Sequence, residues 1–153
     1  MGGPADLRMH PYAPVRLFNQ KEADALIPTL EQLFRRVDPM LARLRELRDL
    51  VDDAESYWGE GLVAAPAEDR DPYAKALAEQ LDLEQSMQAH LDDIHALGVE
   101  VKDLHRGLVD FPARIGDEVA YLCWQRGEDR VAWWHPLESG FAGRKALAPE
   151  TER

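Results

Sequence analysis

Residues 98–144 read GVEVKDLHRGLVDFPARIGDEVAYLCWQRGEDRVAWWHPLESGFAGR, a stretch in which apolar and polar residues alternate in short runs. Three of the four tryptophans, the single cysteine and two of the five histidines lie within it. Alternation with a period of two is typical of β-strands, whose successive side chains point to opposite faces. The stretch therefore predicts a small antiparallel β-sheet.

The clearest pair of predicted strands spans residues 119–124 and 131–135. A turn at residues 126–129 that pairs Gln125 with Arg130 would close this hairpin. One face would then carry Leu122, Trp124, Val131, Trp133 and His135, and the other Tyr121, Cys123, Ala132 and Trp134. Because both faces are apolar, we expect one to be covered by helices and the other by loops or by a second subunit.

A long helix is predicted upstream, at residues 18–58. Asn19 is a suitable N-cap, and Glu22 follows three residues later as in a capping box. Apolar residues then recur at spacings of three and four over more than four heptads, which is the pattern of a coiled-coil seam.

A second helix is predicted at residues 72–97. An acidic connection rich in glycine, residues 59–71, separates it from the first helix. Asp71 followed by Pro72 is typical of an N-cap and a first helical position, and Gly98 of a helix stop.

The predicted fold class is α+β, with a long antiparallel helical hairpin, coiled-coil-like, packed against a small C-terminal antiparallel β-sheet. A chain of 153 residues fits one domain. We expect an irregular arm at residues 1–17, a β-rich cap at residues 98–147 and a tail at residues 148–153.

The charge of the chain is strongly acidic, with 18 basic and 29 acidic residues and a formal net charge of −11. Such a surface repels phosphate, so we expect no nucleic-acid partner. The sequence has neither an apolar run of membrane-spanning length nor the apolar core of a signal peptide. Together with the single cysteine, which suits a reducing compartment, this predicts a cytoplasmic protein with no membrane partner.

The motifs KDL, GLVDF, LCW, GE, WH and GFAGR, which follow the long helical hairpin, suggest a family. As a set, and over residues 18–147, they resemble the bacterial proteins grouped as domain of unknown function 2203. The resemblance implies a small cytosolic bacterial protein of unassigned function, and it implies no catalytic or ligand-binding residues.

His135 is the first candidate for chemistry, because Glu138 follows it closely and Asp110 and Asp103 lie on neighbouring predicted strands. One imidazole with two or three carboxylates is the ligand set of a non-haem iron, manganese or zinc site. The alternative is a structural histidine that is hydrogen-bonded to Glu138 or Asp110 and fixes a loop.

A small ligand is the second possibility. A pocket for an aromatic ligand or a haem, with His135 as axial group, could be lined by Trp124, Trp133, Trp134 and Tyr121. Arg144 could hold a carboxylate or phosphate. The alternative for the tryptophans is core packing. Cys123 is either a buried packing residue or a nucleophile with His135 as its base.

These patterns support two hypotheses for the function. The first is a dimeric binding or assembly module, a homodimer formed through the helices or the second face of the sheet, because the first helix outreaches the second. The second is a metal-binding protein or metal-dependent enzyme. The sequence does not decide whether the chain is an enzyme, because both hypotheses predict the same motif residues.

Overall fold

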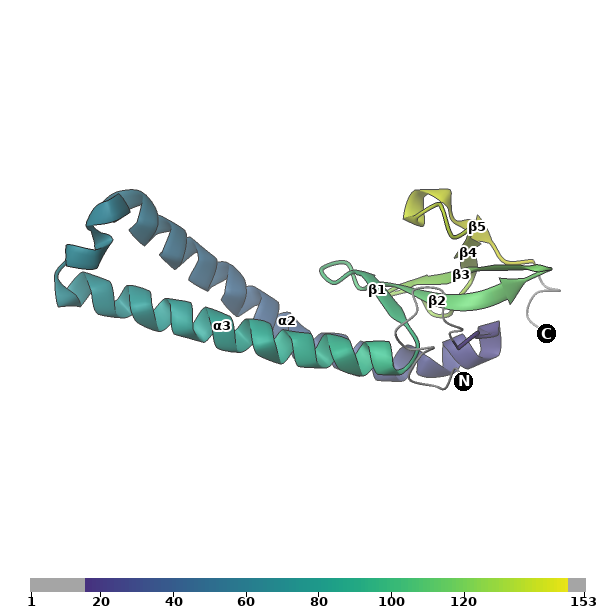
Figure 1. The fold of residues 1–153 in the computed structure, drawn as a ribbon. Helices are drawn as coiled ribbons and strands as arrows, with labels where there is room; N and C mark the ends of the chain where they lie inside the picture. The colour runs from purple at the N-terminus through teal and green to yellow at the C-terminus, as the bar shows by residue number, and fades with distance from the viewer. Residues whose placement is uncertain (1–15, 149–153) are drawn as a thin grey trace, which may run out of the picture. The chain divides into compact units, whose positions relative to one another are not determined.

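The computed structural model describes residues 16–148 (Figure 1). The predicted arm and tail therefore lie almost entirely outside the described residues. The chain divides into two compact units. One, the hairpin unit, comprises residues 30–93, and the other, the sheet unit, contains the described residues 16–29 and 94–148.

The hairpin unit is formed by α2 (Gln20–Trp58), a 3-10 turn η1 (Gly59–Ala64) and α3 (Ala67–Ala96). The first ten residues of α2 and the last three of α3 belong to the sheet unit. Between the helices, Leu47 and Val51 of α2 pack with Ala76, Tyr73 and Leu83 of α3. No helix in the described part of the chain is apolar over enough of its length to cross a lipid bilayer.

Helix α3 begins at Ala67, five residues before the start that Asp71 and Pro72 predict. The carbonyl oxygen of Pro66 accepts the backbone N–H groups of Asp69 and Arg70, which opens the helix earlier. Acidic residues in this first turn also interact favourably with the helix dipole. Pro72 consequently lies inside the helix, in its second turn, where its missing N–H removes one backbone hydrogen bond.

The sheet is an antiparallel meander in the order β1-β2-β3-β4-β5. Its strands are β1 (Glu100–Asp103), β2 (Leu108–Ile115), β3 (Glu118–Gln125), β4 (Trp133–His135) and β5 (Lys145–Ala146). The predicted α+β class, with two long helices followed by an antiparallel sheet, is confirmed.

One face of the sheet forms the core of the sheet unit. Its side chains on β2 and β3 are at most 2% exposed and comprise Val109, Phe111, Ala113, Ala120, Leu122 and Trp124. Phe18, just before α2, packs edge-on against Phe111 with ring centroids 5.2 Å apart, and its N–H donates to the Pro112 carbonyl. The aromatic pair and the burial of this face join the start of α2 to the sheet.

The predicted register of the β3–β4 hairpin is wrong by one residue. The observed partners are Tyr121 with His135, Leu122 with Trp134 and Cys123 with Trp133. Because side chains alternate along a strand, this shift moves Trp133 and His135 to the face that carries Tyr121 and Cys123.

The cause of the shift lies in α2. The N–H of Val131 donates to Asp24 Oδ1 at 2.7 Å, and its carbonyl accepts from Gln20 Nε2 at 2.6 Å. Val131 is therefore bound to the helix on both sides of its backbone and does not pair with β3. The strand β4 starts only at Trp133.

Candidate functional site

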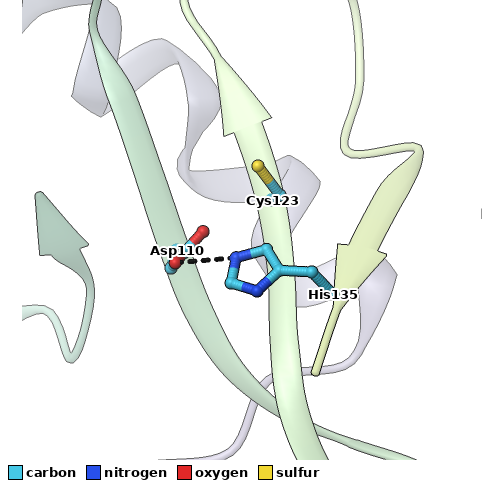
Figure 2. Close-up of side chains that lie close together, drawn as sticks. All are labelled: Asp110, Cys123 and His135. Atoms are coloured by element: carbon cyan, nitrogen blue, oxygen red, sulfur yellow. Dashed lines mark hydrogen bonds and ion pairs between the residues drawn. The ribbon is translucent and has the colours of Figure 1, made fainter. Parts of the chain in front are cut away.

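Three side chains with metal-binding atoms meet on the face of the sheet opposite the core. Asp110 on β2 pairs with Cys123 on β3, and His135 on β4 pairs with Tyr121, two residues from Cys123 on the same face. Figure 2 shows the three side chains converging from adjacent strands. Their potential ligand atoms all lie within 4.8 Å of one another.

Asp110 and His135 form a buried pair. His135 Nε2 lies 2.9 Å from Asp110 Oδ2, and the two side chains are 3% and 2% exposed (Figure 2). The other ring nitrogen of His135, Nδ1, lies 2.8 Å from the carbonyl oxygen of Pro136. The imidazole is thus fixed from both ends.

The hydrogen bonds determine how many protons this pair holds. A carbonyl oxygen only accepts, so Nδ1 of His135 carries a proton and donates it to Pro136. The contact between Nε2 and Asp110 Oδ2 then needs a second proton, located on either atom. Burial raises the pKa of Asp110, whereas its hydrogen bond to His135 acts in the opposite direction. With two protons, the pair has no net charge in either form, which suits its burial.

Cys123 is fully buried beside this pair. Burial, and secondarily the charge of Asp110, raise the pKa of its thiol to about 12, although Arg144 Nη1 lies 3.8 Å from Sγ. At neutral pH the residue is therefore a thiol and not an activated nucleophile. A bound cation would reverse this, because a coordinating thiol loses its proton.

A hollow of about 160 Å³ adjoins the pair, and its wall includes Lys102, Tyr121 and Ser139. Two buried atoms of the wall, Asp110 Oδ1 and Ser139 Oγ, have no hydrogen-bond partner among the described residues. Buried polar atoms are normally paired, so these two indicate a place for a bound ion, water or small polar ligand.

Charged groups near the mouth of the hollow balance one another. Lys102 Nζ donates to Glu100 Oε1 at 2.8 Å, and the Tyr121 hydroxyl donates to Glu100 Oε2 at 2.8 Å. Burial, followed by this hydrogen bond, raises the pKa of Tyr121 to about 12.

Arg144 holds the segment that follows β4 next to Asp110, Cys123 and His135. Its guanidinium lies 4.5 Å from the ring centroids of both Trp133 and Phe141 and forms an ion pair with Glu128. Because it contacts two aromatic rings and already binds a carboxylate, Arg144 orders this segment next to the Cys123 thiol.

The other predicted site residues lie elsewhere. Glu138 is exposed and lines a separate hollow with Trp134. Asp103 accepts the backbone N–H of Arg106 and thereby closes the turn after β1. Trp124 is fully buried on the core face, and its indole donates to the Glu128 carbonyl. The structure therefore unites His135 and Asp110, adds Cys123, and separates Glu138, Asp103, Trp124 and Trp134 from them.

The site also contains Glu100 and Lys102, which the sequence did not indicate, and Tyr121, which the sequence suggested only as a lining residue of an aromatic pocket. A usable signal existed, because Tyr121 and Cys123 alternate along one strand and a correct hairpin register would have placed both beside His135.

The model of a family described as an uncharacterized conserved protein (DUF2203) matches residues 16–147, which is most of the chain. No curated protein and no solved structure matches significantly. The chain belongs to the DUF2203 family.

Proposed function

We propose that this DUF2203 member binds one divalent transition-metal ion through Asp110, Cys123 and His135. The observation that carries the proposal is the convergence of a carboxylate, a thiol and an imidazole on one buried face, within 4.8 Å. Sulfur and nitrogen ligands favour zinc or iron over manganese, which prefers oxygen.

The orientation of His135 supports this proposal. Metal-binding histidines usually donate their second ring N–H to a carboxylate or a backbone carbonyl, which aims the other nitrogen at the metal. His135 has this arrangement, because Nδ1 bonds to Pro136 and Nε2 points toward Asp110.

The distances between the ligand atoms require only small adjustments to fit a metal ion. Ligands at about 2.0–2.3 Å from a tetrahedral ion are separated by roughly 3.3–3.8 Å. His135 Nε2 and Asp110 Oδ2, which lie 2.9 Å apart, would separate by roughly 0.4–0.9 Å. The longer separations in the cluster, none above 4.8 Å, would shorten by at most about 1.5 Å. Side-chain rotation within the hollow can supply this movement. The fourth position would face the hollow and take water or a small ligand, as in catalytic zinc sites.

Binding would also release protons. The thiol of Cys123 would lose its proton, and so would the contact between Asp110 and His135, while Nδ1 would keep its own. We expect about two protons to be released per ion near pH 7, so affinity should rise with pH. A reducing cytoplasm, where we place the protein, keeps the single cysteine available as a ligand.

Calorimetric titration of the untagged protein with zinc, in buffers of different ionisation enthalpy, tests this function. We expect a stoichiometry of one and the release of about two protons. Cys123→Ser and His135→Ala should lose the tight site, whereas His105→Ala, which removes an exposed histidine, should retain it. An absence of stoichiometric binding, or equal binding by all variants, would refute the proposal.

A second candidate function is a binding or assembly module that forms a homodimer. The observation that favours it is the exposure of large apolar side chains on the hairpin unit, where Tyr57 and Leu50 are 81% and 55% exposed. Such a function would not need the metal and would survive His135→Ala.

A further inference from the structure

The part of the hairpin unit around η1, where α2 ends and α3 begins, exposes an unusual number of apolar side chains. Five of the eight exposed large apolar residues in the described part of the chain lie between residues 50 and 81. They are Leu50, Tyr57, Val63, Leu77 and Leu81. Groups of exposed apolar side chains mark interaction surfaces more often than single ones do.

Two of these residues continue a regular row on α2. Arg36, Arg43, Leu50 and Tyr57 follow one another at intervals of seven residues, which is nearly two helical turns. All four therefore lie on one side of the helix, about 10 Å apart. Leu50 is 55% and Tyr57 81% exposed, and the Arg43 side chain is 43% exposed. We call this row the α2 stripe.

The two ends of the α2 stripe differ in charge. On α2 itself, residues 30–48 contain five arginines and three acidic residues, whereas residues 49–58 contain four acidic residues and no basic one. The arginine half of the stripe thus lies in a basic part of α2, and the apolar half lies in an acidic part of the same helix.

This polarity makes the stripe complementary to itself in one orientation. In a parallel arrangement, arginine would face arginine and the acidic parts would repel each other. In an antiparallel arrangement, Arg36 would face Tyr57 and Arg43 would face Leu50 of the other copy. The first contact would be a cation–π pair, with acidic residues such as Asp53 nearby, and the second would use the apolar stem of an arginine whose guanidinium binds Glu79.

We infer that two copies of this chain associate through their α2 stripes in antiparallel orientation. A twofold axis at the level of residues 46 and 47 relates the copies, so each contact occurs twice, as in other isologous dimers. The inference is independent of the metal site, because all of its residues belong to the hairpin unit.

Sedimentation equilibrium of the full chain at low and high salt tests this interface. We expect a dimer that weakens with salt, and we expect Leu50→Asp to raise its dissociation constant at least about tenfold. Val63→Asp is the matched control, because Val63 is exposed on the same hairpin but outside the α2 stripe. Circular dichroism would show that each variant keeps its helices.

A charge exchange tests the antiparallel register itself. Arg36→Glu and Tyr57→Arg should each weaken the dimer at least about tenfold, the first by losing the cation and the second by opposing two cations. The double variant again pairs opposite charges and should restore association. A monomeric wild type would overturn the inference, and so would a dimer whose dissociation constant these substitutions leave unchanged. The inference would also fail if both single variants weakened the dimer and the double variant did not restore it.

Discussion

Replacing His135 by alanine should destabilise the sheet unit severely. The substitution would leave Asp110, whose side chain is 2% exposed, without a partner for Oδ2, while Oδ1 already lacks one. Removal of one member of a buried ion pair typically costs about 3–5 kcal/mol, a large fraction of the roughly 5–15 kcal/mol that stabilises a domain. We expect a loss in this range at pH 7.

The loss should depend on pH in a defined direction. Without His135, burial still raises the pKa of Asp110, and the hydrogen bond and charge of His135 no longer oppose it, so the pKa in the folded state lies further above the unfolded value. A folded state that binds a proton more tightly than the unfolded state loses stability as pH rises through the folded pKa. The deficit of His135→Ala should therefore be smaller in mild acid than at pH 8.

Urea unfolding in the presence of a chelator, followed by near-ultraviolet circular dichroism, would measure both effects. Trp124, Trp133 and Trp134 report on the sheet unit. His105→Ala, at an exposed position, should stay within about 0.5 kcal/mol of the wild type. A loss below about 1 kcal/mol for His135→Ala, or a deficit that grows in acid, would refute the account of the buried pair.

Three further outcomes follow from the sheet unit. Because the pKa of Cys123 is raised to about 12, its thiol in the metal-free protein should react with a disulfide reagent at pH 8 far more slowly than in urea, and equal rates would contradict its burial. Asp24→Ala should cost about 1–3 kcal/mol by leaving the buried N–H of Val131 unpaired, whereas Asp24→Asn should cost less in the same urea titration. Because its pKa is raised to about 12, Tyr121 should ionise at higher pH than an ordinary tyrosine in an ultraviolet titration. The stability that it contributes should be complete below pH 10 and decline as pH rises toward 12. Tyr121→Phe should remove this decline.

Local sequence patterns were sufficient to predict both long helices and the presence of the strands. The seam spacing identified α2, and the alternation of residues 119–124 identified β3, because both patterns express which side of an element is buried. The start of α3 was misplaced because Asp71 and Pro72 form a plausible cap, while the carbonyl of Pro66 opens the helix earlier.

The site required information that no local pattern contains. The register of β4 depends on Gln20 and Asp24, which precede Val131 by 111 and 107 residues. Closeness in sequence suggested Glu138 as a partner for His135, but the adjacent strand placed Cys123 there instead. Asp110 could be selected because its predicted strand was expected to join the same sheet as that of His135.

X-ray absorption at the zinc edge of the metal-loaded protein tests the central claim most directly. The account predicts one sulfur ligand at about 2.3 Å and nitrogen or oxygen ligands at about 2.0–2.2 Å, with the sulfur absent from Cys123→Ser. A spectrum with only nitrogen and oxygen ligands, unchanged by that substitution, would contradict a metal site at Asp110, Cys123 and His135.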